Sequence, residues 1–117
     1  MIKHSRTRFL TLFFFLTCIF ANQYVVTVEV FTETWWPYCP DARAGVQELY
    51  SNHPNVIPLI WQGNSEYESP NYGMRASQYG VSGIPHVEFG GTLTSIGGGG
   101  NMYPTYLGKY NQLINYD

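Results

Sequence analysis

Cys39 is the side chain of this 117-residue chain that is best suited to covalent chemistry. It ends the segment Trp36-Pro37-Tyr38-Cys39, which has the spacing of a redox Cys-x-x-Cys motif with tryptophan in place of the first cysteine. In such a motif, the amides and macrodipole of a helix N-terminus stabilise the first thiolate. The spacing predicts that Trp36 occupies this position and that Cys39, one turn further into the helix, carries a less reactive thiol.

The motif leaves two interpretations of Cys39 open. It is either a thiol that forms mixed disulfides or accepts glutathione or an oxidant, or a small buried hydrophobic residue, as free cysteines often are. Trp36 either offers an exposed aromatic anchor to a partner or only disables the site. Disulfide exchange within the chain would need a second cysteine, and the other one, Cys18, lies in an N-terminal segment with the features of an export signal.

That N-terminal segment, residues 1–21, predicts a secretory signal peptide. Three basic residues precede an apolar run from Phe9 to Ala21, which is shorter than the roughly 20 residues that span a bilayer. We therefore expect a domain over residues 22–117 that is exported to the periplasm, the cell envelope or the medium, without a permanent membrane span. A minority alternative is lipid attachment at Cys18.

The elements that position the motif follow from hydrophobic periodicity. Residues Tyr24–Phe31 predict a buried strand, and a helix follows Cys39. A strand at Val56–Trp61, whose Pro58 indicates a sheet edge or a bulge, precedes a polar loop and a helix from Tyr72 to Tyr79 closed by Gly80. The last elements are two strands, Pro85–Phe89 and Thr92–Ile96, joined by Gly90-Gly91, and a helix from about Pro104. The order β-α-β-α-β-β-α predicts an α/β domain with a central mixed sheet flanked by helices. The expected apolar helix stripes are Ala42, Val46, Leu49 and Tyr50, and then Tyr103, Tyr106, Leu107, Tyr110, Leu113 and Ile114.

Charge and ligand spacing exclude two classes of function. Residues 22–117 hold three basic and eight acidic side chains, a net charge of −5, which argues against binding to nucleic-acid phosphates. One cysteine and the scattered His53 and His86 show no metal-ligand spacing, so no metal site is expected. Nothing in the sequence brings either histidine to Cys39 as a general base.

Two segments carry a resemblance to the thioredoxin superfamily. The stretch from Phe31 to Pro40 resembles its strand-end Cys-Pro-Tyr-Cys-Pro segment except at Trp36, and Tyr79–Pro85 is similar to the segment that ends in its cis-proline. The resemblance covers roughly residues 24–116 and extends to exported, envelope-associated thioredoxin-like domains. It implies a thioredoxin-like fold and descent from thiol-disulfide oxidoreductases.

The resemblance also implies where ligands bind. Its peptide-binding surface corresponds to Trp35, Trp36, Pro37, Tyr38, Ile84 and Pro85, which would engage an extended polypeptide or a protein thiol. The segment around Gly97 and Gly98 is similar to a glutaredoxin segment that holds glutathione, although a glycine-rich turn entering a helix explains it equally well. No bound cofactor is expected, and glutathione enters only as a thiol partner. The family's buried carboxylate corresponds to Val30, while the neighbouring Glu29 should face the other side of the sheet.

These observations predict an exported thioredoxin-like protein with one motif cysteine and impaired dithiol exchange. The alternative is a non-catalytic thioredoxin-fold module that binds extended polypeptide. Both hypotheses place the function at the same surface, and they differ in whether the sulfur of Cys39 takes part.

Overall fold

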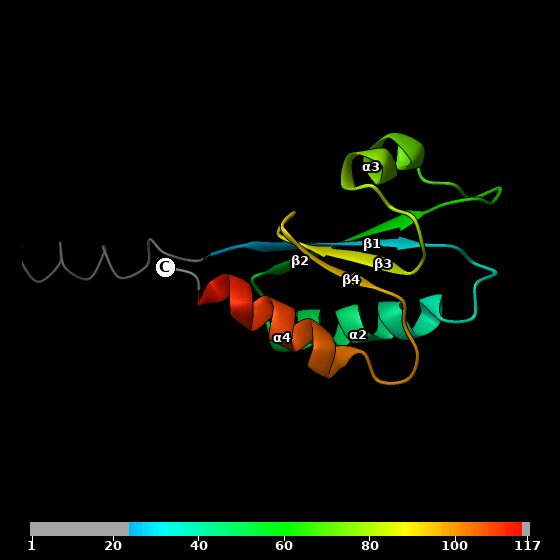
Figure 1. Cartoon of the computed structure of the whole chain (residues 1–117). Coiled ribbons are helices and arrows are strands. Elements are labelled where there is room, and N and C mark those ends of the chain that lie inside the picture. The colour runs from blue at the N-terminus through cyan, green and yellow to red at the C-terminus, as the bar shows by residue number, and fades with distance from the viewer. Residues whose placement is uncertain (1–23, 116–117) are drawn as a thin grey trace, which may run out of the picture.

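The computed structural model describes residues 24–115, so the predicted signal peptide and Cys18 lie outside the described residues. The elements follow the predicted order (Figure 1). They are β1 (Val26–Thr32), α2 (Cys39–Asn52), β2 (Val56–Gln62), α3 (Tyr72–Tyr79), β3 (His86–Phe89), β4 (Leu93–Ile96) and α4 (Tyr103–Ile114).

The strands form one mixed sheet in the order β2-β1-β3-β4. β1 pairs with β2 in parallel and with β3 antiparallel, and β3 pairs antiparallel with β4. Helices α2 and α4 lie on one face of the sheet and α3 lies on the other (Figure 1). The predicted α/β class with a central mixed sheet is therefore confirmed.

The main core lies between the sheet and the helix pair α2 and α4. Alternate residues of β1 and β3 face this layer, as the pleat of a strand requires. Gly45 lets the two helices approach closely, because a Cβ atom there would lie 2.9 Å from both Met102 Cβ and the Tyr106 ring. The core residues are Val26, Val28, Val30, Ala42, Val46, Leu49, Val56, Val87, Phe89, Tyr106 and Tyr110.

The face under α3 is built differently, from aromatic rings and polar groups. The ring of Phe31 lies about 6 Å from four other rings, those of Trp61, Tyr72, Tyr79 and His86. Helix α3 has no fully buried residue of its own, so these ring contacts and the polar groups beside them attach it to the sheet.

Strand β2 forms an edge of the sheet, as Pro58 predicted. Two hydrogen bonds lie at the ends of the parallel ladder between β1 and β2: Val26 N–H donates to Asn55 O, and Gly63 N–H donates to Thr32 O. They direct the amides of odd-numbered β2 residues toward β1 and those of even-numbered residues outward. The nitrogen of Pro58, which carries no hydrogen, therefore lies on the open side.

Three local expectations were wrong. Tyr50 is 45% exposed and does not join the core stripe of α2, and Ile114 is exposed near the end of α4. The turn between β3 and β4 contains Thr92 as well as Gly90 and Gly91, because Phe89 pairs directly with Leu93. Both glycines of that turn have positive φ, as the sequence predicted.

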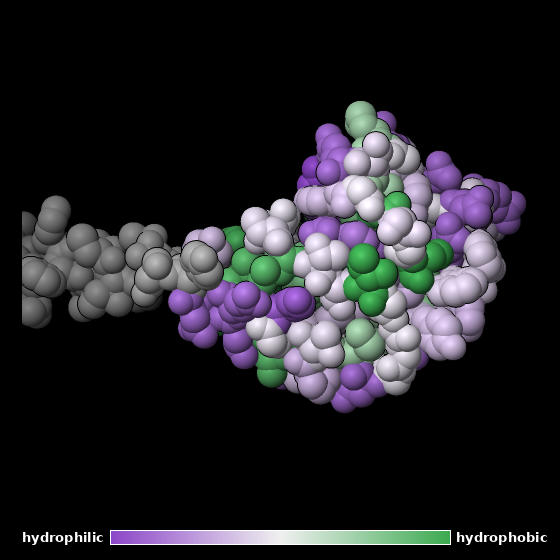
Figure 2. Space-filling model, viewed as in Figure 1, coloured by the Kyte–Doolittle hydropathy of each residue, from purple (hydrophilic) through white to green (hydrophobic). Residues whose placement is uncertain are grey.

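The surface is unevenly hydrophobic. On the face shown in Figure 2, apolar residues gather in the middle of the molecule, and polar residues surround them. Within residues 24–115, no helix combines the length and the apolar character that crossing a membrane requires.

Candidate functional site: the motif turn and the cis-proline groove

Two successive tight turns carry the chain from β1 into α2. Trp36 N–H donates to Glu33 O at 3.4 Å, and Cys39 N–H donates to Trp36 O at 3.2 Å. The first bond with helical i to i+4 spacing runs from Ala42 N–H to Tyr38 O. Helix α2 therefore begins at Cys39, and Trp36 lies in the preceding turn. The prediction that Trp36 occupies the helix N-terminus, with Cys39 one turn further in, was wrong.

The sulfur of Cys39 faces the protein interior. The residue is 0% exposed, and Glu33 N–H donates a hydrogen bond to Cys39 Sγ at 3.4 Å. This enclosure withholds the sulfur from a partner in solution. Cys39 is thus a buried thiol in a polar setting at a helix start.

Among residues 24–115, no carboxylate is buried on the core side of the motif. Val30 is fully buried, and the hydroxyls of Thr32 and Tyr106 are buried without a hydrogen-bond partner within residues 24–115. Burial raises the pKa of Tyr106, and the charge of Cys39 adds to the shift. Tyr106 therefore stays neutral at physiological pH.

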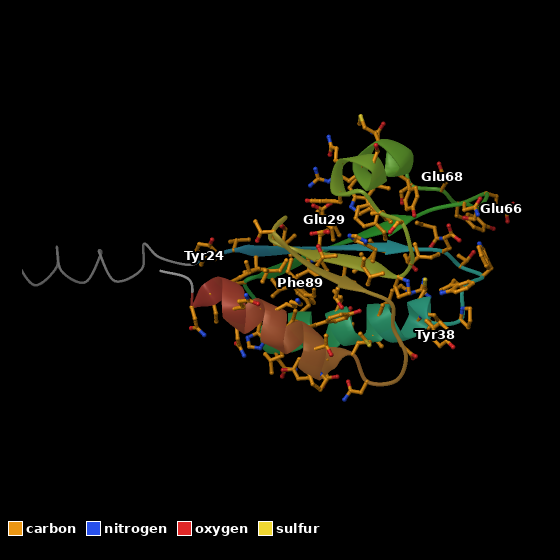
Figure 3. The ribbon with its side chains drawn as sticks, viewed as in Figure 1. Tyr24, Glu29, Tyr38, Glu66, Glu68 and Phe89 are labelled. Carbon is orange, nitrogen blue, oxygen red and sulfur yellow. The ribbon has the colours of Figure 1, made fainter. Side chains whose placement is uncertain are left out.

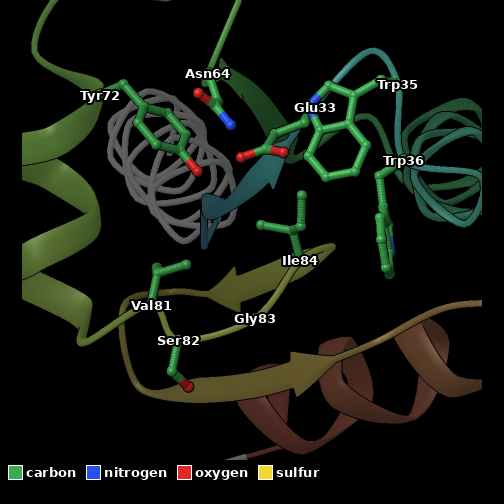
Figure 4. Close-up of a pocket in the computed structure, with 9 residues that line it drawn as sticks. All are labelled: Glu33, Trp35, Trp36, Asn64, Tyr72, Val81, Ser82, Gly83 and Ile84. Carbon is green, nitrogen blue, oxygen red and sulfur yellow. The ribbon is translucent and has the colours of Figure 1, made fainter.

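A cavity of about 470 Å³ opens beside the motif turn (Figure 4). The indole rings of Trp35 and Trp36 meet edge to face there, with centroids 5.3 Å apart and planes at 87°. The Glu33 carboxylate lies between Tyr72 and Trp35 in the close-up, with Ile84 beside it. The cavity is lined by Glu33, Trp35, Trp36, Asn64, Tyr72, Val81, Ser82, Gly83 and Ile84.

The segment before β3 forms the opposite wall of this groove. The Ile84–Pro85 peptide bond is cis. Within residues 24–115, neither the N–H nor the C=O of Ile84 has a hydrogen-bond partner, whereas Pro85 O accepts from Gly97 N–H at 2.8 Å. The Ile84 backbone is therefore free to pair with an extended chain.

The structure brings most of the predicted peptide-binding residues together. Trp35, Trp36 and Ile84 line the cavity. Tyr38 and Pro85 meet at Gly98, where a Cβ atom would lie 3.0 Å from Tyr38 O and 3.1 Å from Pro85 Cγ. The sixth, Pro37, is exposed and does not line the cavity.

The glycine-rich segment that leads into α4 is tied to the motif by its own hydrogen bonds. Gly100 N–H donates to Asp41 Oδ2 at 2.8 Å, and Tyr103 N–H donates to Asn101 Oδ1 at 3.1 Å. These bonds occupy two of the amides near the start of α4.

Neither histidine forms a pair with Cys39. His86 Nε2 lies 2.7 Å from Glu88 Oε1 on the α3 side of the sheet, and the ring of His53 packs on that of Tyr110. In the described part of the chain, no group of three or more His, Cys, Asp or Glu side chains is arranged to hold a metal ion.

Sequence reasoning missed a buried ionic network under α3. Glu29, which is 2% exposed, faces α3 (Figure 3) and accepts hydrogen bonds from Arg75, Tyr79 and Trp61 at 2.5 to 2.9 Å. The hydrogen bond from Arg75 holds the pKa of Glu29 below its usual value of 4.5, although burial alone would raise it. The sequence held only part of the signal, because helical spacing groups Arg75 with Tyr72 and Tyr79 but does not pair it with Glu29.

Comparison with known proteins agrees with this geometry. Over 72 residues the chain is 28% identical to thioredoxin of Methanocaldococcus jannaschii, a match that covers 62% of this chain and 79% of that protein. The chain is similar to thioredoxins in sequence and has a thioredoxin-like fold. Among solved structures, this thioredoxin-like chain superposes on thioredoxin from Trypanosoma brucei brucei with a TM-score of 0.60, at 17% identity and covering 85% of this chain and 82% of that one.

A second structural match is mitochondrial thioredoxin 3 of Saccharomyces cerevisiae. The TM-score is 0.56 at 21% identity, and the match covers 86% of the thioredoxin-like chain and 88% of the yeast chain. No protein-family model matches. The fold and the sequence match relate the chain to thiol-disulfide oxidoreductases.

Proposed function

We propose that this thioredoxin-like protein binds extended polypeptide in the groove between the motif turn and Ile84-Pro85, without dithiol exchange of its own. One contrast carries the proposal: the recognition surface is open, while the sulfur of Cys39 is enclosed. Trp35 is 58% exposed and the Ile84 backbone is unpaired within residues 24–115, whereas Cys39 is 0% exposed. An exposed aromatic anchor beside free backbone groups suits the addition of an extended strand.

Binding without the thiol is tested with a Cys39→Ala variant. An extended valine–threonine peptide is titrated into the isotopically labelled protein, and the indole N–H signals of Trp35 and Trp36 report binding. We expect the peptide to shift both signals, with the same Kd in wild type and Cys39→Ala. Loss of binding in a folded Cys39→Ala variant, or no shift in either protein, would contradict the proposal.

A second candidate function is thiol exchange between Cys39 and an outside partner. It is favoured by the position of Cys39 at the start of α2 and by the amide that donates to its sulfur. Incubation with oxidised glutathione followed by intact-mass measurement distinguishes the two. A stable glutathione adduct on Cys39 in the folded protein would support exchange, whereas adducts that form only in urea would support the binding function.

Glutathione enters this proposal only as a partner in exchange. Two amides near the start of α4 are already occupied by Asp41 and Asn101, so the segment around Gly97 and Gly98 offers few free donors for a carboxylate. We assign that segment the role of packing on Tyr38 and Pro85.

Export of the domain is also part of the proposal. It is supported by the basic and apolar pattern of residues 1–21. Expression of the full chain followed by fractionation and N-terminal sequencing tests it. A mature N-terminus near residue 22 in an exported fraction is the expected result, and an uncleaved chain in the cytosol would contradict it.

A further inference from the structure

We propose that the cavity beside the motif turn recognises a lysine or arginine side chain of the bound polypeptide. This inference rests on the proposed function, since the basic side chain belongs to the chain that occupies the groove. It adds a charge preference, which an open hydrophobic groove would lack.

The first reason is the charge of the cavity lining. Glu33 is its one ionisable acid, and the Glu33 carboxylate forms no hydrogen bond or ion pair within residues 24–115. No basic residue of the described part of the chain lines the cavity. Arg75 follows the lining residue Tyr72 on α3, but its guanidinium is bound to Glu29 and does not neutralise Glu33. The carboxylate is therefore an unoccupied partner for an incoming cation.

The second reason is the aromatic character of the walls. The rings of Tyr72 and Trp35 flank the Glu33 carboxylate, and Trp36, which also lines the cavity, lies beside Trp35 (Figure 4). Trp35 is 58% exposed, so much of its indole surface is accessible to a ligand. A cation within about 6 Å of an indole face is attracted by the ring quadrupole. A long basic side chain also packs its apolar stem against such rings while its charge reaches the carboxylate.

The third reason is the electrostatic surroundings of the cavity. Glu68 Oε2 accepts from the backbone N–H of Asn64, a lining residue, so a second acid lies at the rim. The pKa of Tyr72 is raised mainly by burial, and the negative charges of Glu33 and Glu68 raise it further. Figure 3 shows Glu66 and Glu68 at the same end of the molecule as Tyr38. A cation that approaches this end meets a negative field, and an acidic peptide is repelled.

The test uses three valine–threonine peptides that differ only in a central lysine, methionine or glutamate. Methionine matches the length of lysine closely without its charge. We expect the lysine peptide to bind roughly tenfold more tightly than the methionine peptide, which corresponds to about 1.4 kcal/mol from an ion pair and a cation–π contact together. The glutamate peptide should bind most weakly. Added salt should weaken binding of the lysine peptide and leave the methionine peptide nearly unchanged.

Two variants assign the preference to the cavity. Glu33→Gln should lower the affinity for the lysine peptide close to that for the methionine peptide and leave the latter unchanged. Trp35→Leu keeps an apolar side chain but removes the ring face, so it should also reduce the lysine preference. The control is Glu48→Gln, which neutralises an exposed acid on α2 outside the cavity and should preserve the tenfold difference.

The outcomes separate this inference from the proposed function. If all three peptides bind equally to wild type, the groove binds polypeptide but the charge preference is wrong. If none binds, both proposals are wrong. A lysine preference that survives in folded Glu33→Gln and Trp35→Leu would place the recognition elsewhere and overturn the assignment to this cavity.

Discussion

Position 36 and position 39 of the motif differ in accessibility. Trp36 lies in the turn before α2 and lines an open cavity. The sulfur of Cys39 points inward and accepts a hydrogen bond from the backbone N–H of Glu33. A nucleophile at position 36 would therefore be reachable by a disulfide substrate, while the thiol at position 39 would serve to release it.

The first prediction concerns this missing nucleophile. Trp36→Cys should give the protein dithiol activity, because the two turns that hold positions 36 and 39 depend on backbone hydrogen bonds. We expect reduction of insulin disulfides by dithiothreitol to be accelerated by on the order of tenfold over wild type.

The matched control is the double variant Trp36→Cys/Cys39→Ala, which keeps the new thiol but lacks the second one and should not complete the cycle. A folded Trp36→Cys variant that stays as slow as wild type would show that other losses dominate. The absence of a carboxylate at Val30 is the first of these to examine.

The second prediction concerns Glu29. Glu29→Gln removes the charge that Arg75 meets, and we expect the free energy of unfolding at pH 7 to fall by about 1–3 kcal/mol. Because the folded-state pKa of Glu29 lies below its usual value of 4.5, its stabilisation is present above that pH and is lost as the pH falls below it.

Urea titrations at pH 7 and at about pH 3 check this prediction. The stability difference between wild type and Glu29→Gln should shrink at the lower pH. Glu48→Gln, on an exposed site, provides the control and should unfold like wild type. If the difference in the free energy of unfolding between wild type and Glu29→Gln were equal at both pH values, the ionised form of Glu29 would not be what stabilises the fold.

Among the elements, the contact between α2 and α4 depends on one small residue. Gly45→Ala would place a methyl group 2.9 Å from Met102 Cβ and the Tyr106 ring. Such overpacking costs about 1–3 kcal/mol, which outweighs the roughly 1 kcal/mol that alanine gains over glycine in a helix. We expect a lower melting temperature for Gly45→Ala.

The same helix pair contains a matched control. A Cβ atom at Gly108 of α4 meets nothing within 4 Å. Gly108→Ala should therefore raise the melting temperature through helix propensity alone. Thermal melts followed by circular dichroism compare the two variants, and equal effects would mean that the close approach at Gly45 does not constrain the helices.

Local patterns were enough to predict the elements and their order. The β-branched and aromatic residues of β1 and the glycines of the hairpin specify structure over a few positions, so one sequence suffices to recognise them. Pro58 predicted either an edge position or a bulge for β2, because proline has no N–H to donate to a ladder, and the strand is at the edge.

The remaining features depend on contacts between distant segments. The start of α2 is set by a bond from Cys39 N–H to Trp36 O, and the enclosure of the Cys39 sulfur depends on the layers packed around it. The periodicity that assigned Tyr50 to the core does not say how far α4 extends over α2. The partner of Glu29 is 46 positions away in the sequence, so only the fold identifies it.

At the scale of the whole molecule, the two faces of the sheet are held by different forces. The α2 and α4 side is an apolar core, and the α3 side relies on aromatic contacts and an ionic network. Helix α3 has no fully buried residue, so it should be the element that detaches first in acid. Hydrogen exchange at decreasing pH would show this as earlier loss of protection in α3 than in α2, and simultaneous loss would contradict it.

The placement of Pro58 limits what this protein can do at high concentration. Three large aliphatic residues of β2 are exposed, which is the composition of a strand prone to stack with copies of itself. Two of the outward-facing amides of β2 are already bonded within the chain, since Val56 N–H donates to His53 O and Gln62 N–H donates to Ser69 Oγ. The nitrogen of Pro58 carries no hydrogen. Within residues 24–115, Ile60 alone then offers an outward amide on this strand.

Pro58→Val should supply the second donor and cause self-association that increases with concentration in sedimentation experiments. Adding Ile60→Lys should return the variant to monomers, and a Pro58→Val protein that stays monomeric would contradict the argument. A single proline thus keeps the exposed apolar edge of the sheet from pairing with copies of itself. Under the proposed export, this protection would operate as the domain refolds after translocation.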